Sequence, residues 1–360
     1  MTDEADGRAS GSVAPDDLPY PAHWEADVVL RDGRTCHIRP IRPTDGPALE
    51  EFHKGLSEET LYMRFFTASQ ELMAKDIERL LHADYRDHVG LLAIVGGAVV
   101  GIGNYDSVGR AEGEIAFTIS DAHQGRGLGS VLLEHLAAVA RENGVHRFRA
   151  EVLSGNKKML ATFAAAGYTP SQELEDGIVL LDFDIDPTLK SRRVARSREH
   201  RAESLSIQKL LEPRSVAVIC DDVSEGSPGA NLVSNIHDGG FDGHLAVVSQ
   251  SGESVGAVEG YRTLTAVGGT VDLVVMAMSP DAVEYLLDEC AACGVRGIVL
   301  VTGDFITDHD YSRQTDLVRR VRELGMRLIG PNTLGFMNTD PGVSLNASLV
   351  PDMPNRGRIG

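Results

Sequence analysis

The chain has 360 residues, of which 42% are hydrophobic and 24% charged, so it is globular in composition and long enough for two domains. Its formal net charge of -19 argues against a surface that binds nucleic acid. No apolar run has the length of a transmembrane helix, and the acidic start is unlike a signal peptide. We therefore expect a cytoplasmic protein with no membrane partner.

The first 24 residues are rich in Asp, Ser and Gly, which predicts a disordered tail over residues 1–24. From Glu25 an ordered pattern predicts a first domain over residues 25–186. We expect a hairpin at residues 27–30 and 35–39. Two helices follow at residues 45–56 and 72–81, the first capped by Thr44. A three-stranded antiparallel meander is then expected at residues 88–95, 98–105 and 114–120. We then expect a helix at residues 130–143, a strand at 148–153, a second helix at 156–166 and a closing strand at 178–185. This order predicts an α+β domain with a mixed, mostly antiparallel sheet.

A basic segment interrupts the pattern at residues 187–205, where Lys and Arg outnumber the acids. We interpret it as a solvated linker that is able to form a helix. The alternative is a contact for an acidic partner or for the acidic remainder of the protein.

Beyond the linker the pattern changes class, and we expect a second domain over residues 206–360. Short apolar strands at residues 215–220, 244–248, 271–278, 297–302 and 327–329 alternate with helical stretches at residues 230–238, 282–293 and 312–324. Such alternation predicts an α/β, Rossmann-like domain with a parallel sheet. Residues 358–360 look like the start of another strand, so we expect the domain to be truncated at its C-terminal end.

The pair Cys290 and Cys293 has the spacing of half a metal or redox site. It has no second pair and lies in a helical pattern, so we interpret both residues as core and predict no metal.

The most informative motif is the glycine-rich loop Gln124-Gly125-Arg126-Gly127-Leu128-Gly129, between a strand pattern and a helical pattern. A glycine turn at the start of a helix exposes several backbone N–H groups at the positive end of the helix dipole. The loop therefore predicts a site for a cofactor that carries a diphosphate.

This loop resembles the acyl-CoA loop of the GNAT acetyltransferases, Q/R-x-x-G-x-G/A, through Gln124, Gly127 and Gly129. The resemblance covers residues 27–185 and includes the order of elements. It implies acetyl-CoA as cosubstrate and no metal. The phosphates of acetyl-CoA would contact Gln124, Gly127 and Gly129 and also the other loop residues, Gly125, Arg126, Leu128 and Ser130. The pantetheine arm would pair with the backbone of Phe117, Thr118 and Ile119, where the GNAT sheet splays open. Asn156 would lie near the pantetheine or the phosphates; the simpler interpretation is a helix N-cap, and the two roles are compatible.

Three stretches resemble the GNAT domain of bacterial protein lysine acetyltransferases more specifically: Leu30-Arg31-Asp32-Gly33, Ile38-Arg39-Pro40-Ile41-Arg42 and Leu61-Tyr62-Met63-Arg64-Phe65-Phe66. This resemblance implies a protein lysine N-acetyltransferase. It also implies protein acceptors, among them AMP-forming acyl-CoA synthetases.

Acetyl transfer needs a neutral amine, whereas a free lysine, with a pKa near ~10.4, is mostly charged at neutral pH. A carboxylate near the thioester can take its proton. Strand alternation places Glu114, Ala116 and Thr118 opposite a core face made by Ile115, Phe117 and Ile119. We therefore predict Glu114 as the general base, as the resemblance also implies. Glu112 is the competing carboxylate, and a solvated strand glutamate without a role is the simpler alternative.

One departure concerns Phe163. Many small-amine GNAT enzymes resemble this chain but carry a tyrosine at the equivalent position, as the acid for the leaving thiolate. Phe163 leaves that proton to water and disfavours the alternative of a small-amine N-acetyltransferase. A non-catalytic module that senses CoA or acyl-CoA is a further alternative, against which Glu114 argues.

The second domain resembles the CoA-binding domain of NDP-forming acyl-CoA ligases and of succinyl-CoA synthetase α chains. The match rests on residues 329–335, with residues 344–347 and 357–360 extending it over residues 206–360. A Gly-Ala-Ser loop is usual after the first strand, but this chain has Asp221-Asp222, which would repel a phosphate. These 360 residues also show neither a phosphohistidine segment nor an ATP-grasp pattern. We therefore expect a regulatory or scaffolding role.

Overall fold

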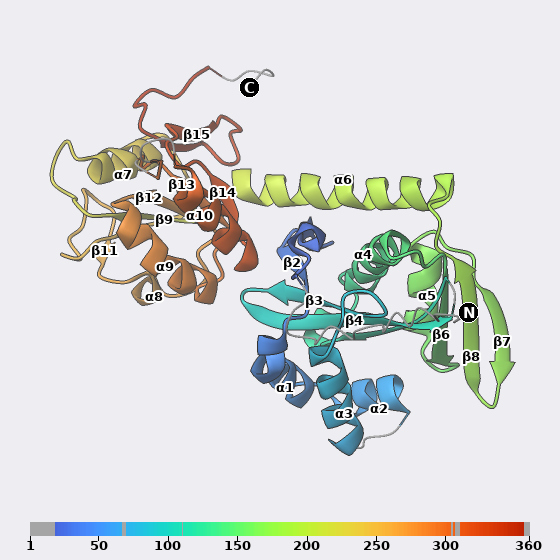
Figure 1. The fold of residues 1–360 in the computed structure, drawn as a ribbon. Helices are drawn as coiled ribbons and strands as arrows, with labels where there is room; N and C mark the ends of the chain where they lie inside the picture. The colour runs from blue at the N-terminus through green and yellow to red at the C-terminus, as the bar shows by residue number, and fades with distance from the viewer. Residues whose placement is uncertain (1–18, 67–69, 110, 304, 307–309, 356–360) are drawn as a thin grey trace, which may run out of the picture.

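The computed structural model describes residues 19–66, 70–109, 111–303, 305–306 and 310–355. Within them the chain forms two sheet-based domains that one long helix, α6, connects (Figure 1). Residues 1–18 and 356–360 lie outside this description, and so do the disorder predicted for most of the tail and the strand predicted at the C-terminal end. No described helix is both long and apolar enough to cross a membrane.

The first domain is built on an eight-stranded mixed sheet in the order β1-β2-β3-β4-β5-β6-β8-β7. Every neighbouring pair is antiparallel except β5 and β6. The predicted fold class is thereby confirmed. The strands are β1 (Ala26–Val29), β2 (Thr35–Pro40), β3 (His88–Val95), β4 (Ala98–Gly109), β5 (Glu112–Ile119), β6 (Arg147–Leu153), β7 (Ser171–Glu175) and β8 (Ile178–Asp184).

Helices cover both faces of this sheet because side chains alternate along its central strands. On β3, Leu91 packs in the core under α4 and α5, whereas Leu92 packs in the core under α1 and α3. Figure 1 shows α1, α2 and α3 on one side of the sheet and α4 and α5 on the other. The helices are α1 (Gly46–Lys54), α2 (Glu58–Phe65), α3 (Gln70–Leu81), α4 (Leu128–Glu142) and α5 (Lys157–Ala165).

Two local predictions for this domain need correction. Thr44 does not cap α1, because it lies in the short 3-10 helix η3 (Pro43–Asp45) and the N-cap is Asp45. The Asp45 carboxylate instead accepts the N–H of Arg42 at 2.7 Å. Order also begins before Glu25, because Trp24, at the end of η2 (Ala22–Trp24), is buried and its indole Nε1 donates to Glu142 at 3.0 Å. The disorder predicted for the end of the tail is therefore wrong.

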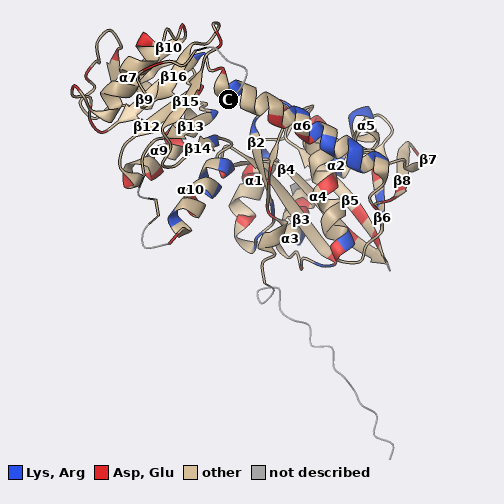
Figure 2. Cartoon of the chain, turned by 90° about the horizontal axis from the view of Figure 1, so that it is seen from above, with Lys and Arg blue, Asp and Glu red and all other residues tan. Residues whose placement is uncertain are grey.

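The basic segment forms a single helix, α6 (Leu189–Leu211), which Thr188 and Ser191 cap reciprocally. Figure 2 shows Lys and Arg along it in blue. One of them, Arg198, forms an ion pair with Glu134 of α4, so the alternative interpretation, a contact with the acidic remainder of the protein, holds for this residue. At its other end α6 meets the second domain, where Arg327 donates to Ser206 at 3.0 Å and pairs with Glu203.

We predict that Arg198→Met lowers the free energy of unfolding at pH 7 by about 2 kcal/mol, somewhat less than for a fully buried pair. The two side chains are 14% and 19% exposed, so the variant leaves a mostly buried carboxylate without its partner. Burial raises the pKa of Glu134 to about 6, and Arg198 opposes that shift. Since the folded-state pKa lies above the unfolded one, protonation of Glu134 favours the native state as the pH falls through this range.

The loss caused by Arg198→Met should therefore shrink between pH 7 and pH 5, which urea titrations at the two pH values will measure. Arg196→Met, at an exposed position of the same helix, is the matched control. Equal stability of Arg198→Met and Arg196→Met at pH 7 would show that α6 is not docked through this pair.

The second domain contains a six-stranded, all-parallel sheet in the order β11-β10-β9-β12-β13-β14, as the Rossmann-like prediction requires. The strands are β9 (Ser215–Cys220), β10 (His244–Val248), β11 (Gly260–Tyr261), β12 (Leu273–Ala277), β13 (Gly297–Leu300) and β14 (Arg327–Ile329). Separate core clusters lie on the two faces, one under α7 and one under α8, α9 and α10. These helices are α7 (Pro228–Asp238), α8 (Leu264–Val267), α9 (Pro280–Ala292) and α10 (Ser312–Glu323), and a hairpin of β15 (Gly335–Asn338) and β16 (Leu345–Ser348) comes after β14.

Cys290 of α9 is buried in the core of this domain, and burial raises the pKa of its thiol to about 12. Cys293 is half-buried and lies 3.9 Å from the hydroxyl of Thr265. Both residues thus pack as small side chains on one helix, which supports the core interpretation.

Candidate active site

The sheet of the first domain opens between β5 and β6. The register of the two strands pairs Glu112 with Arg147 and ends where Glu114 meets Arg149, although β5 continues to Ile119. Beyond Glu114, no strand among the described residues pairs with this edge of β5. Its backbone groups are therefore available to an added extended ligand, as the resemblance implied for Phe117, Thr118 and Ile119.

Glu114 lies at the point where the two strands part. Its side chain is exposed and has neither a hydrogen bond nor an ion pair with any residue that the structure describes. The competing carboxylate, Glu112, is half-buried and paired with Arg149 at 2.9 Å. Glu114 is therefore the more available proton acceptor of the two.

The predicted alternation along β5 holds only in part. Glu114 is exposed and Ile115 is buried, as expected, and Phe117 and Ile119 pack against the core. Thr118, which we placed on the outward face, is buried. The helices α1 to α3 cover that face of the sheet, and the periodicity of a strand contains no signal for such a cover.

A charge cluster on α2, α3 and β4 lies beside Glu114. Burial lowers the pKa of the Arg64 guanidinium, and the carboxylates of Asp76, Asp106 and Glu114 counteract it. Arg79 bridges Asp76 at 2.9 Å and Asp106, which lies opposite Glu114 on β4. Cations thus lie beside both strand carboxylates and offset their mutual repulsion.

The glycine-rich loop forms the first turn of α4. Gly125 and Gly127 have φ values of +77° and +89°, and Gly127 is the N-cap of α4 without any side-chain cap. The N–H of Val131 bonds to the carbonyl of Gly127 at 3.2 Å, which leaves the N–H groups of Gly129 and Ser130 without a helical acceptor. The helix therefore starts at Leu128 rather than at Ser130 as predicted, because an αL N-cap lets it begin inside the glycine pattern.

Cations gather around this loop. The Arg31 side chain lies over Gly127, Arg126 pairs with Asp32 at 3.1 Å, and burial together with Arg126 and Arg34 lowers the pKa of His123. Free N–H groups and nearby guanidinium groups both favour an anion. These features favour an anion at the loop, and the diphosphate site there stays a prediction.

A hydrogen-bond network that the sequence did not reveal ties the loop to α2. Asp121, in the short helix η4 (Asp121–His123), accepts the N–H of Ser57 at 2.9 Å and the hydroxyls of Ser57 and Thr60 at 2.7 Å each. Thr60 in turn accepts Nε2 of Gln124 at 3.1 Å, and Lys158 of α5 donates to Gln124 at 3.4 Å. Asp121 thereby positions Gln124, the first residue of the predicted loop.

We predict that Asp121→Ala weakens acetyl-CoA binding about tenfold and costs about 1–2 kcal/mol of stability, because several hydrogen bonds to a carboxylate are lost. Calorimetric titration with acetyl-CoA and urea denaturation measure the two effects. Asp84→Ala is the matched control, since Asp84 accepts the N–H groups of Arg86, Asp87 and His88 away from the loop. The Asp84→Ala variant should lose stability but keep its affinity for acetyl-CoA. An equal loss of affinity in this variant would show that Asp121 has no specific role in positioning the loop.

Two further predicted residues have clear places in the structure. Asn156 is the N-cap of α5, and its side-chain oxygen accepts the N–H of Met159 at 3.1 Å, which confirms the cap. Phe163 is fully buried, with its ring centroid 5.3 Å from that of Phe183. It contributes packing and no acid to the site.

The loop after β9 in the second domain does not suit a diphosphate. Asp221 accepts the N–H of Ser279 at 2.9 Å, and Asp222 accepts the N–H and hydroxyl of Ser224 at 2.8 and 2.7 Å. Within the described part of the chain no Lys, Arg or His pairs with either carboxylate. Hydrogen bonds alone, and no cation of the described residues, therefore stabilise the negative charge of this loop.

Residues 55–168 match the acetyltransferase (GNAT) family, and residues 214–339 match the CoA binding domain family. Acetyltransferase PA5475 of Pseudomonas aeruginosa is 32% identical over 159 residues, which are 43% of this chain and 84% of that protein. The chain belongs to the GNAT acetyltransferase family. The GNAT domain of S. lividans PAT, a crystal structure, is 50% identical and aligns with 46% of this chain and 99% of that one, at a TM-score of 0.44.

The other half of this GNAT protein matches a different class of enzyme. The 4-hydroxybutyrate–CoA ligase [ADP-forming] of Nitrosopumilus maritimus is 29% identical over 152 residues, 42% of this chain. The match covers 22% of that ligase, so the chain spans about a fifth of its length. The fusion of a GNAT domain with a CoA-binding domain of the NDP-forming ligase type, predicted from the motifs, is confirmed.

Proposed function

We propose that the chain transfers the acetyl group of acetyl-CoA to the ε-amine of a lysine in a protein acceptor. The observation that carries this proposal is the position of Glu114, an exposed carboxylate with no partner among the described residues, where β5 leaves β6. The anion-binding loop lies at the other end of the same strand. The proposed base and the loop proposed for the diphosphate would then share one open strand edge.

In the proposed reaction, one set of residues binds acetyl-CoA and Glu114 transfers the proton. Gln124 to Ser130 would hold the phosphates, and the free edge of residues 117–119 would pair with the pantetheine arm. Glu114 takes a proton from the lysine ammonium, and the nitrogen lone pair then forms the amide bond as the thioester C–S bond breaks. The thiolate leaves, and the second proton that the nitrogen loses as the amide forms reaches it through water, because Phe163 has no proton to give.

The acceptors we propose are AMP-forming acyl-CoA synthetases. The support is the resemblance of residues 30–33, 38–42 and 61–66 to bacterial protein lysine acetyltransferases. The test incubates the chain and acetyl-CoA with a panel of such synthetases and reads intact masses. We expect a gain of one acetyl group on at least one synthetase, and none when Glu114→Gln replaces the wild type. Acetylation of spermidine with no synthetase modified would favour a small-amine enzyme instead.

A further inference from the structure

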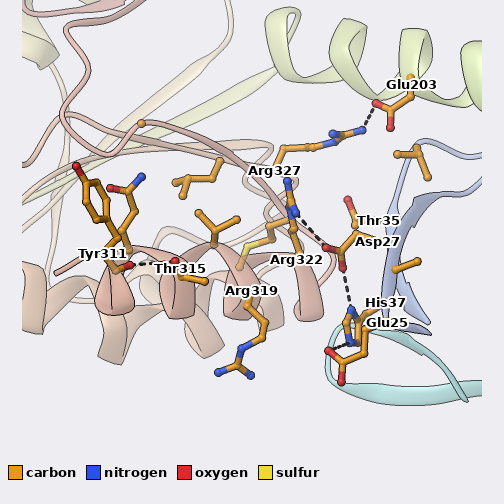
Figure 3. A pocket seen from close by; sticks show the side chains of 17 residues that line it. Glu25, Asp27, Thr35, His37, Glu203, Tyr311, Thr315, Arg319, Arg322 and Arg327 are labelled. Atoms are coloured by element: carbon orange, nitrogen blue, oxygen red, sulfur yellow. Dashed lines mark hydrogen bonds and ion pairs between the residues drawn. The ribbon is translucent and has the colours of Figure 1, made fainter. Parts of the chain in front are cut away.

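A cleft of about 770 Å³ lies between the two domains, and none of residues 124–130 of the glycine-rich loop lines it. Its walls are the β1–β2 hairpin of the GNAT domain and, across from it, α10 and β14 of the second domain (Figure 3). Pockets for small organic ligands typically measure about 300–1,000 Å³. The cleft is therefore large enough for a metabolite that contacts both domains.

A buried hydroxyl without a partner lines this cleft. Thr35 is only 4% exposed, and its Oγ1 makes no hydrogen bond with any residue that the structure describes. A buried polar group that stays unsatisfied costs about 1–3 kcal/mol, so such groups are rare without a reason. An acceptor atom of a ligand in the cleft would satisfy this hydroxyl.

The acidic side chains of the cleft are already engaged. Asp27 accepts Nδ1 of His37 at 2.8 Å through one oxygen and binds Arg322 at 3.2 Å through the other. Glu203 is paired with Arg327. Glu25 accepts the hydroxyl of Tyr20 at 2.6 Å and Arg42 at 2.9 Å. Little acceptor capacity therefore remains for a cationic ligand.

Donor capacity does remain at Arg322, whereas Thr315 donates to the carbonyl of Tyr311 at 3.0 Å and Arg319 pairs with Asp316 and Glu323 at 3.0 Å each. Figure 3 shows Tyr311, Thr315, Arg319 and Arg322 along one side of α10, opposite Thr35. Their spacing of three or four residues places them on one helical face. Arg322 uses one terminal nitrogen for Asp27, which leaves its other N–H groups without a protein partner within the described residues. Val318, Met326 and Leu328 add apolar surface to the lining.

We infer that this interdomain cleft is a binding site for a small organic anion, which accepts from Thr35 and Arg322 through a phosphate or a carboxylate. The ligand would contact the GNAT domain through β2 and the second domain through α10. This inference does not rest on the proposed function, because it uses none of the residues assigned to acetyl transfer.

The test is calorimetric titration of the full chain with inorganic phosphate, adenosine 5′-monophosphate and succinate, each with excess CoA present to occupy the glycine-rich loop. We expect at least one probe to bind the wild type. Binding of inorganic phosphate or the nucleotide would indicate a ligand with a phosphate group, and binding of succinate would indicate a ligand with a carboxylate. Thr35→Val and Arg322→Gln should each weaken it about tenfold or more, the loss of one hydrogen bond to a charged group. Arg320→Gln, on α10 but paired with Asp288 at 2.5 Å and outside the lining, is the matched control and should bind as the wild type does.

Thr35→Val keeps the shape of the side chain and breaks no protein hydrogen bond, so it should fold normally and remains informative even if Arg322→Gln disturbs the domain contact. Failure of all three probes to bind the wild type overturns the inference. Unchanged affinity of Thr35→Val overturns it too, because binding would then lie elsewhere. Acetyl transfer is not part of the readout, so neither outcome bears on the proposed function.

Discussion

Replacing Glu114 by glutamine is expected to slow acetyl transfer about 10²–10⁴-fold at pH 7, the usual cost of losing a general base. The amide keeps the size of the side chain but cannot take a proton. Glu114 has no partner within the described residues, so the substitution should leave the fold and the acetyl-CoA affinity nearly unchanged. Steady-state rates with a synthetase that the wild type acetylates measure the transfer rate, and calorimetric titration measures the affinity for acetyl-CoA.

The dependence of this defect on pH separates a base from a binding residue. A lysine with a pKa near ~10.4 loses its proton unaided as the pH rises, so the gap between Glu114→Gln and the wild type should narrow towards alkaline pH. A binding residue would leave the gap constant. Glu112→Gln is the control, since it removes only the ion pair with Arg149 at the surface. If Glu112→Gln loses turnover while Glu114→Gln keeps it, the base is the other carboxylate.

Gly127→Val is expected to lower the affinity for acetyl-CoA by about two orders of magnitude, because several N–H bonds to phosphate, worth about 1.5–3 kcal/mol each, depend on this turn. Gly127 has a φ of +89°, where a β-branched residue is strained, and a Cβ there would lie 3.1 Å from Nε of Arg31. The substitution thus disturbs both the exposed N–H groups and a cation beside them.

Gly144→Val is the matched control for Gly127→Val. Gly144 lies just beyond the other end of α4 with a φ of +80°, and nothing lies within 4 Å of a Cβ built on it. Both variants carry similar backbone strain, but only Gly127→Val should lose acetyl-CoA in a calorimetric titration, with circular dichroism as the check on folding. Wild-type affinity in a folded Gly127→Val protein would place the phosphates elsewhere.

Local patterns predicted those elements whose signals are local. The continuous apolar run of residues 88–95 indicates a buried strand, and the glycines of residues 124–129 indicate a helix start. Among the elements that were not predicted, α2 and β7 of the first domain have only a weak local signal. The eight residues of α2 bury none of their side chains, and every residue of β7 is exposed at the sheet edge. Neither has a clear apolar face from which a prediction can start.

The parts of the site that the sequence did not reveal depend on residues far apart in the chain. Asp121 is 64 residues from Ser57, and Gln124 is likewise 64 residues from Thr60. No spacing rule links such partners, because the sheet and its helices bring them together only in the folded domain. The same holds for the cleft, where Thr35 and Arg322 come from different domains.

The docking of α6 at both ends has a consequence for chain length. Each residue added to an α-helix rotates the C-terminal part of the helix by about 100° and advances it by about 1.5 Å. Arg198 is held by the first domain and Glu203 by the second, so one residue inserted between them would rotate the second domain away from β2. Only insertions close to a whole number of turns would keep both contacts. The length of α6 thus sets the relative orientation of the two domains as well as the distance between them.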